Sequence, residues 1–254
     1  MTFLNNSRYF DKLHAAWGHE RFLLLSPFYL TRKRLIMQMI EELDLFNSKV
    51  LDIGCGVGDL LSTLLAKRIT CRGIDLSIFA LRAARSRMKD SELIQADARF
   101  LPYRSSSFSV VLCSEVLEHI RRDDQAVEEI HRVLERNGVA IVTVPQGEQH
   151  WTEEDSEDGH LRRYSKMYLA RMFESTGFRT DELIYWGFPM AVIFRKLVST
   201  PIFRRRLHER MSKSSLVGGI GLLSRLIVVF FRIDDISKNL HLGLGLILKA
   251  RKVL

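Results

Sequence analysis

The residues whose types and spacing most clearly indicate a functional site are the glycines of segment 52–58, which reads Asp-Ile-Gly-Cys-Gly-Val-Gly. This segment joins a short apolar run to a stretch with helical spacing of apolar residues. Glycine adopts positive φ angles and lets a ligand approach the backbone, and the start of a helix presents unpaired N–H groups. Ligands of open α/β sheets bind beyond the carboxyl ends of the strands, so we predict a ligand site at this turn.

The spacing of the glycines discriminates between cofactors. A dinucleotide-binding GxGxxG pattern that begins at Gly54 needs a glycine at position 59, where the chain has Asp59. An aspartate there also repels a pyrophosphate, which disfavours a nicotinamide-dependent oxidoreductase. A ligand that carries a sulfonium and an ammonium group meets no such repulsion.

Two further carboxylates follow apolar runs. Asp75 closes the run 70–75, 17 residues after Gly58, and a carboxylate at that place accepts both hydroxyls of a ribose. The alternative for Asp75 is a helix cap or a surface turn. Asp97 follows the run 92–96 and is placed to accept the amino group of an adenine. The end of the run 108–115 should face the same crevice.

Two histidines are catalytic candidates, because imidazole titrates near neutral pH. His119 follows the strand predicted over 108–113 and would position or deprotonate a reacting group. Its alternative is packing or capping at the start of the next helix. His160 is a candidate base in a polar loop, and its alternative is a solvated loop histidine.

The loop around His160 also offers candidate substrate contacts. Arg162, Arg163 and Tyr164 would clamp a phosphate or carboxylate, or equally would only anchor the loop. Trp151 is expected to close over a substrate. The acidic run 153–158 is more typical of a solvated, mobile lid than of a metal site, so we assign no metal ligands.

Apolar periodicity predicts the elements that position these residues. Strands are expected over 49–53, 70–75, 92–96, 108–113, 139–144, 182–186 and 244–250. Helices are expected over 31–43, 60–67, 77–88, 123–136 and from 165 to a stop at Gly177, and their predicted caps and stops are Thr31, Ser77, Ser165 and Asn137-Gly138. Apolar residues 168, 169, 172 and 173 should face inward. Strands that alternate with helices indicate an α/β fold with a doubly wound parallel sheet.

The chain divides into three parts by composition. Residues 1–45 are an aromatic helical lead-in or flap, 46–189 with 241–254 form the ligand-binding domain, and 190–240 are a basic, apolar helical insertion or cap. The net charge of +8 is uneven, because residues 195–254 hold 13 Lys or Arg against 3 Asp or Glu. This excess favours contact with an anionic surface, either membrane or nucleic acid, and the alternative is a solvated basic face.

The spacing of the cysteines and the N-terminal residues are used to predict the cellular compartment. Cys55, Cys71 and Cys113 form no CxxC pair, which disfavours a zinc site or a disulfide framework. The chain begins without a basic segment followed by an apolar core, and it has no run of about 18 apolar residues. We therefore expect a cytoplasmic protein, at the inner face of the membrane if the insertion docks there.

These motifs together resemble those of class I S-adenosylmethionine-dependent methyltransferases. The matching residues form four parts, in order over 48–145: 50–58 (Val-Leu-Asp-Ile-Gly-Cys-Gly-Val-Gly), 73–77 (Gly-Ile-Asp-Leu-Ser), 95–98 (Gln-Ala-Asp-Ala), and 108–111 (Phe-Ser-Val-Val) together with 117–119 (Leu-Glu-His). A match in four parts is more specific than one glycine motif. The resemblance implies a Rossmann-like sheet of seven strands, with the last strand antiparallel beside the fifth.

The resemblance also implies roles for residues around the cofactor S-adenosyl-L-methionine. Residues expected around its methionine part are Asp52, Gly54, Cys55, Gly56 and Gly58, with Cys113 or Ser114 along the same side. Those expected around its adenosine are Asp75 for the ribose, Leu76 packed on the adenine, and Asp97 and Ala98 at the adenine edge.

Within the family, the chain is similar to the small-molecule branch that includes quinone-biosynthesis and bacterial lipid- or polysaccharide-associated methyltransferases. The similarity rests on 117–119, on 159–164 and on Gly177-Phe178. It implies methyl transfer to an oxygen or nitrogen of a small or lipid-linked acceptor. No Asn-Pro-Pro-Tyr-type segment follows the fourth predicted strand, which makes a nucleic-acid methyltransferase a weaker alternative.

The insertion suggests a membrane contact. Residues 216–231 are almost wholly apolar and lie between basic residues, a composition typical of an interfacial helix, although a buried cap or dimer face would explain it equally well. A catalytically silent, cofactor-binding partner protein at a membrane remains a further alternative.

Overall fold

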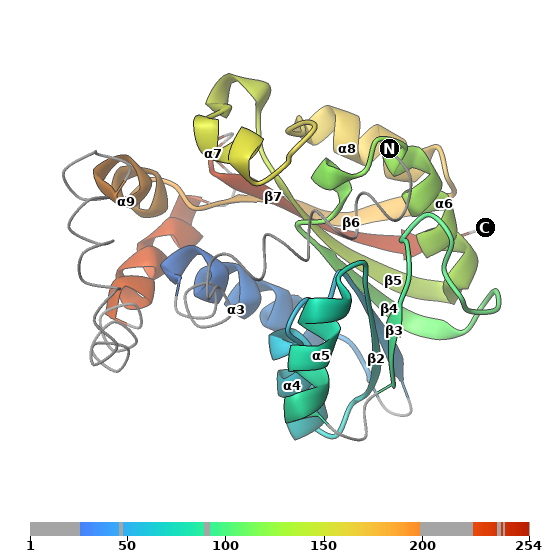
Figure 1. Ribbon diagram of the computed structural model, residues 1–254. Coiled ribbons are helices and arrows are strands. Elements are labelled where there is room, and N and C mark those ends of the chain that lie inside the picture. The colour runs from blue at the N-terminus through green and yellow to red at the C-terminus, as the bar shows by residue number, and fades with distance from the viewer. Residues whose placement is uncertain are drawn as a thin grey trace.

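The computed structural model describes residues 26–45, 48–88, 92–198, 226–237, 240 and 242–253. Its described residues form a seven-stranded sheet in the order β3-β2-β1-β4-β5-β7-β6 (Figure 1). The strands are β1 (Lys49–Ile53), β2 (Thr70–Asp75), β3 (Glu92–Gln95), β4 (Phe108–Ser114), β5 (Leu134–Pro145), β6 (Phe178–Trp186) and β7 (Gly245–Lys252). Only β7 runs antiparallel to its neighbours, β5 and β6. This order confirms the predicted Rossmann-like, doubly wound α/β fold.

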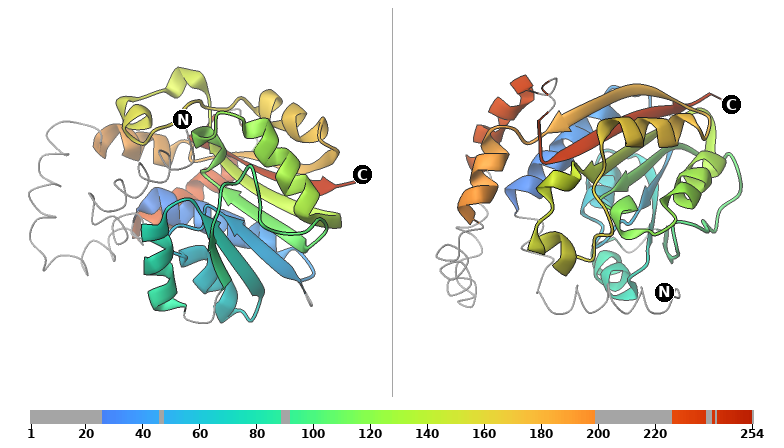
Figure 2. Two further views of the ribbon diagram at one scale, coloured as in Figure 1. Left: turned by 45° about the vertical axis from the view of Figure 1, so that its right-hand side comes forward. Right: turned by 90° about the horizontal axis from the view of Figure 1, so that it is seen from above.

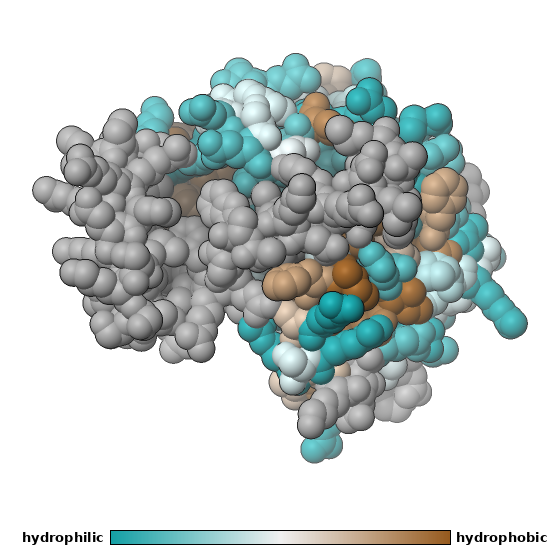
Figure 3. Space-filling view, viewed as in Figure 1, coloured by the Kyte–Doolittle hydropathy of each residue, from teal (hydrophilic) through white to brown (hydrophobic). Residues whose placement is uncertain are grey.

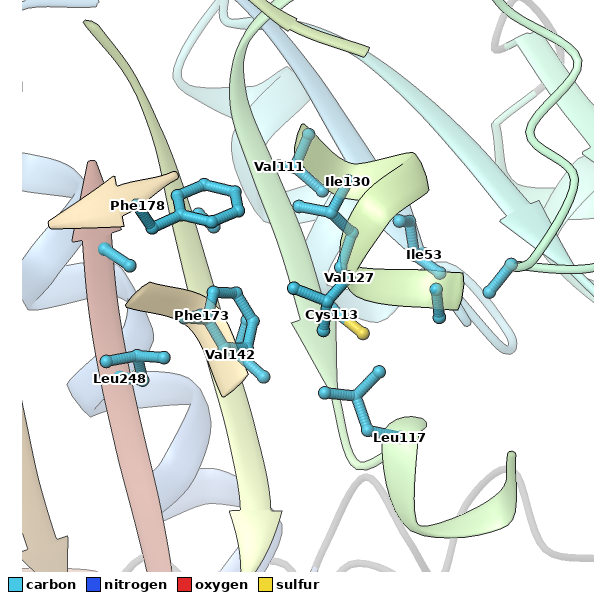
Figure 4. Close-up of a cluster of buried hydrophobic side chains, with 14 of the residues drawn as sticks. Ile53, Val111, Cys113, Leu117, Val127, Ile130, Val142, Phe173, Phe178 and Leu248 are labelled. Carbon is cyan, nitrogen blue, oxygen red and sulfur yellow. The ribbon is translucent and has the colours of Figure 1, made fainter. Parts of the chain in front are cut away.

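Helices cover both faces of the sheet (Figures 1 and 2). One face carries α3 (Pro27–Glu41), α4 (Asp59–Ala66) and α5 (Ile78–Arg87), whose apolar residues share one buried cluster with the sheet. The other face carries α6 (Asp123–Val133) and α8 (Lys166–Glu174). On that face Val127, Ile130 and Phe173 pack against strand residues such as Val142 and Leu248 (Figure 4). Shorter elements are η1 (Leu117–His119), η2 (Glu148–His150) and α7 (Glu153–Glu157).

The helix starts test the predicted caps. The Ser77 hydroxyl accepts a hydrogen bond from the Ala80 N–H at 3.1 Å, and the Ser165 hydroxyl accepts one from the Tyr168 N–H at 3.2 Å. Both caps are therefore confirmed. The prediction for Thr31 is wrong, because α3 begins at Pro27 and Thr31 is buried inside the helix. Proline is favoured at the first helical position, where its missing N–H costs nothing.

The end of α6 also differs from the prediction. The helix stops at Val133 and β5 begins at once, so Asn137-Gly138 does not end the helix. The register between β4 and β5 shifts between Phe108 and Val110, opposite this stretch of β5. Lys252 of β7 donates hydrogen bonds to the carbonyl oxygens of His131 and Leu134 at 2.8 Å each. A residue from the far end of the chain thus satisfies the carbonyls at the helix end.

The predicted inward face of α8 needs a smaller correction. Leu169 and Phe173 are fully buried, as expected, but Tyr168 is about half exposed. Tyr168 lies beside the ring of the buried Tyr164, with centroids 5.9 Å apart. The apolar stripe of α8 is therefore narrower than the spacing of its residues suggests.

The described parts of the insertion pack beside α3. They are α9 (Met190–Val198), a helix at 226–231 and η4 (Arg232–Ser237). The rings of Phe28, Phe194 and Phe231 form a cluster with centroid distances of 5.7 to 5.8 Å. Arg34 of α3 pairs with Asp235 through two hydrogen bonds of 2.7 and 2.8 Å. The described residues of the stretch 190–240 therefore lie next to α3, and in the sequence they fall between β6 and β7.

Some predictions fall outside the described residues. They concern the aromatic lead-in before residue 26 and the basic and apolar residues between 199 and 225. The described part of the N-terminal segment is α3, which packs on the sheet through Leu35, Ile36, Met39 and Ile40.

Candidate functional site

The glycine loop lies at the carboxyl end of β1 and is fastened to β2. The N–H groups of Gly54 and Cys55 both donate to the carbonyl oxygen of Ile74, at 2.8 and 2.9 Å. Gly54 and Gly56 have φ angles of 70° and 53°, which L side chains rarely adopt. A Cβ atom on Gly54 would lie 2.3 Å from Val116, whereas a Cβ atom on Gly56 would meet no atom of the described residues within 4 Å. Among the described residues, Gly56 therefore leaves space beside the loop.

Asp75 connects this loop to the start of α5. One of its carboxylate oxygens accepts from the Gly56 N–H and the other from the Ser77 N–H, both at 2.8 Å. These bonds fix the orientation of the carboxylate, and a carboxylate oxygen accepts more than one hydrogen bond. Leu76 is half-buried next to it. Asp75 and Leu76 thus lie at the carboxyl ends of the strands, as the glycine loop does.

Asp97 has a partner within the chain. Arg99 donates to both of its carboxylate oxygens, with the shortest bond at 2.6 Å. Burial acts to raise the pKa of Asp97, but the hydrogen bonds from Arg99 outweigh it and hold the pKa below its ordinary value. Ala98 is buried beside it. The contact of Asp97 and Ala98 with adenine stays a prediction. Asp97 would make this contact while it also accepts hydrogen bonds from Arg99.

The structure separates Cys113 from Ser114. The thiol of Cys113 is fully buried in the core near Val127 (Figure 4), and this burial raises its pKa well above the ordinary value. Successive residues of a strand face opposite sides of the sheet, and Cys113 takes the side that α6 covers. Of the two alternatives, Cys113 or Ser114, this burial favours Ser114 on the methionine side, and the contact stays a prediction. Ser114 is half-buried and its hydroxyl lies 2.9 Å from that of Thr143.

Three side chains from the first turns of α3 contact Asp59 and Glu115, which follow the carboxyl ends of β1 and β4. Tyr29 donates to Asp59 at 2.8 Å, and the ammonium group of Lys33 pairs with the same carboxylate. Arg32 lies 3.4 Å from the carboxylate of Glu115, which follows β4. Asp59 is therefore neutralised by Lys33, so its charge alone is a weaker argument against a pyrophosphate than the sequence suggests. None of these contacts was predicted, because they depend on how α3 packs.

The two candidate catalytic histidines lie side by side. The ring centroids of His119 and His160 are 4.9 Å apart, although the residues belong to η1 and to the loop after α7. Burial, and then the neighbouring His160, lower the pKa of His119 to about 4, so its imidazole is neutral at neutral pH. Glu118 of η1 is fully buried beside them, and burial, then the charge of Glu115, raise its pKa well above the ordinary value. Sequence reasoning missed Glu118, although it lies inside the matching motif.

The loop that carries His160 is anchored by buried ion pairs. Asp155 accepts from Arg163 through two bonds of 2.9 Å and lies 2.7 Å from Nδ1 of His160. Asp123 accepts from Arg162 at 2.7 Å and from the Tyr164 hydroxyl at 2.8 Å. Tyr164 is fully buried and Arg163 nearly so. The polar groups of Arg162, Arg163 and Tyr164 hold the loop in place, which favours the anchoring alternative, and a contact with substrate stays a prediction.

The remaining lid residues are more accessible. Trp151 is 42% exposed and its indole N–H donates to the Ser156 hydroxyl at 3.3 Å. Around α7 the surface is mostly hydrophilic (Figure 3), as expected for the acidic run. Asp155 departs from that expectation, because it is the buried anchor of the segment. A contact between Trp151 and substrate stays a prediction.

Comparison with known proteins identifies a methyltransferase domain in the chain. Residues 51–142 match the model of a methyltransferase domain. The chain is 34% identical over 122 residues to methyltransferase GfsG of Streptomyces halstedii, a stretch that covers 45% of this chain and 44% of GfsG. It is 29% identical over 180 residues to a ubiquinone biosynthesis O-methyltransferase of Thiobacillus denitrificans, covering 62% and 76% of the two chains.

Residues 51–142 therefore form a methyltransferase domain, and the relatives support the class I S-adenosylmethionine-dependent type. Solved structures agree in fold. A phosphoethanolamine N-methyltransferase 2 of Haemonchus contortus, in complex with S-adenosyl-L-methionine, superposes with a TM-score of 0.68 at 18% identity, covering all of this chain and 60% of that one. The [4+2]-cyclase SpnF superposes with a TM-score of 0.61 at 21% identity, covering 87% and 81%.

S-adenosyl-L-methionine, the cofactor of this methyltransferase family, fits the edge formed by β1 and β2. Gly56 leaves room beside the loop, and the oriented carboxylate of Asp75 is suited to accept from ribose hydroxyls. Asp52 is buried at the end of β1, and burial, then the charge of Asp75, raise its pKa to about 8. A cationic amino group nearby would be favoured by the ionised form of this carboxylate.

This pKa gives the methyltransferase a testable pH dependence. Asp52 is protonated below about pH 8, and an ammonium group favours its ionised form, so binding of such a ligand releases a proton there. We expect the affinity for S-adenosylhomocysteine, measured by calorimetry, to increase between about pH 6 and pH 8. Asp52→Asn should flatten this increase, and adenosine, which lacks the ammonium group, should show none. Equal pH profiles for wild type and Asp52→Asn would contradict the role of Asp52.

Proposed function

We propose that this chain transfers a methyl group from S-adenosyl-L-methionine to an oxygen or nitrogen of a small or lipid-linked molecule. The observation that carries the proposal is the pairing of His119 and His160 next to the glycine loop. Val116, three residues before His119, lies so close to Gly54 that a Cβ atom there would clash with it. We infer from this contact that the imidazoles would hold an acceptor near the methionine side of the cofactor.

The chemistry requires mainly alignment from the protein. The sulfonium of the cofactor supplies an activated methyl group, so the protein aligns the acceptor and excludes water. The glycine loop and Asp75 would hold the donor, and α3 would cover this edge through Tyr29, Arg32 and Lys33. The neutral imidazole of His119 is able to accept a hydrogen bond from an acceptor hydroxyl or amine.

The names of relatives support a small-molecule acceptor but include more than one acceptor atom, since a ubiquinone/menaquinone biosynthesis C-methyltransferase of Campylobacter jejuni is also similar. One relative is a ubiquinone biosynthesis O-methyltransferase, and one solved structure is a phosphoethanolamine N-methyltransferase. A shared fold alone does not fix the reaction, as the [4+2]-cyclase illustrates. Turnover of S-adenosyl-L-methionine with hydroxyl- and amine-bearing small molecules separates our proposal from a silent cofactor-binding protein. Methylation of nucleic acid alone would favour the nucleic-acid alternative.

His160 provides the sharper test of where the acceptor lies. We expect His160→Asn to lower kcat by about 100-fold, because misplacing a reactant by about 1 Å costs that much, and to leave the affinity for S-adenosylhomocysteine unchanged. His150→Asn is the matched control, since His150 belongs to η2 in the same segment between β5 and α8 and should retain wild-type turnover. Unchanged turnover in His160→Asn would contradict the proposed position of the acceptor.

We further propose that the insertion docks on an anionic membrane surface. Its described residues expose Leu197, Val229 and Phe230, of which Phe230 is 61% exposed, beside the exposed cations Lys196 and Arg232. Apolar side chains next to basic ones are the composition of interfacial membrane segments. Among the helices that the structure describes, none is long and apolar enough to cross a bilayer, so the proposal is limited to the surface.

Flotation with anionic vesicles tests this docking. We expect the protein to float with the vesicles and the association to weaken with salt, because the electrostatic part is screened. Phe230→Glu should reduce flotation by adding a negative charge to the apolar surface. Phe100→Glu is the control, since Phe100 is 67% exposed and lies between β3 and β4, outside the insertion. Absence of flotation, or equal loss in both variants, would overturn the proposal.

A further inference from the structure

Three potential metal ligands meet at one point beside the candidate active site. Glu118 and His119 come from η1, and His160 comes from the anchored loop after α7. Each offers one ligand atom, and these atoms all lie within 4.8 Å of one another. None of the three belongs to the acidic run 153–158, which was considered from the sequence as a metal site and not assigned as one. The cluster is therefore a separate arrangement, assembled by the fold.

Glu118 is the group that most needs a cation. Its side chain is fully buried, and within the described part of the chain neither carboxylate oxygen has a hydrogen-bond partner. A buried polar group without partners is costly, and native proteins normally satisfy such a group or pair it with an ion. The nearby arginines are committed elsewhere, because Arg163 pairs with Asp155 and Arg32 with Glu115.

The two imidazoles are oriented as metal ligands usually are. Nδ1 of His160 lies 2.7 Å from the carboxylate of Asp155, and Nδ1 of His119 lies 3.3 Å from the carbonyl oxygen of Gly159. When Nδ1–H donates to an oxygen, the lone pair of the neutral ring is on Nε2. Metal-binding histidines characteristically use such a second bond to a carboxylate or carbonyl to fix ring orientation.

We propose that Glu118, His119 and His160 bind a divalent transition-metal ion, for which Zn²⁺ is the simplest probe. Two imidazole nitrogens and one carboxylate oxygen form a known zinc donor set. Three protein ligands leave at least one coordination position for another molecule, as in catalytic rather than structural sites. If the proposed function holds, that position is where an acceptor oxygen or nitrogen would bind, and the histidines would act on it through the ion.

Calorimetric titration with Zn²⁺ alone, after treatment of the full chain with a chelator, tests the site. We expect one tight Zn²⁺ per chain, and we expect Glu118→Gln and His160→Asn each to weaken it by about 100-fold or more, since even partners outside the ligand set contribute 10–100-fold. His150→Asn should bind Zn²⁺ as the wild type does. Absence of tight binding, or equal affinity in wild type, Glu118→Gln and His160→Asn, would overturn the proposal.

Two readouts keep the interpretation clear. Thermal unfolding and S-adenosylhomocysteine affinity report whether each variant is folded, and His160→Asn carries the test if Glu118→Gln does not fold. Zn²⁺ binding is measured without donor or acceptor, so a chain that binds Zn²⁺ but never transfers methyl groups would refute the proposed function and retain the site. Methyl transfer that is insensitive to chelators, together with no Zn²⁺ binding, would refute the metal site and retain the proposed function.

Discussion

The carboxylate of Asp75 is the interaction on which the cofactor site depends. It accepts one hydrogen bond from Gly56 in the glycine loop and one from Ser77 at the start of α5, both at 2.8 Å. These bonds join the carboxyl ends of β1 and β2, which are neighbours in the sheet. The same side chain therefore borders the space beside Gly56 and would accept from the ribose, and its charge contributes to the raised pKa of Asp52.

A second set of buried carboxylates builds the acceptor side. Asp155 pairs with Arg163, and Asp123 accepts from Arg162 and Tyr164. The loop that these contacts anchor places His160 beside His119. Breaking a buried ion pair leaves an uncompensated charge, which makes such anchors costly to disrupt and keeps the loop in one position. In the proposed function the two halves of the site would thus rest on different aspartates, with Asp75 on the donor side and Asp155 and Asp123 on the acceptor side.

Features that depend on nearby residues were predictable from the sequence. The strands, the Ser77 and Ser165 caps and the glycine loop follow from local spacing and side-chain chemistry. Features set by distant residues were not. The end of α6 depends on Lys252, the partner of Tyr164 is Asp123, and the Glu118 cluster needs His160. Arg163 in a polar loop suggests an anion clamp, and only the fold reveals that the anion is Asp155.

The affinity of Asp75→Asn for S-adenosylhomocysteine, measured by calorimetry beside the wild type, tests the account most directly. The account predicts binding weaker by about 10- to 100-fold, because hydrogen bonds to a charged group contribute about 1.5–3 kcal/mol. Asp181→Asn, near the start of β6 at the opposite edge of the sheet, should bind normally. If folded Asp75→Asn protein kept wild-type affinity, the cofactor would not lie where the glycine loop and Asp75 meet.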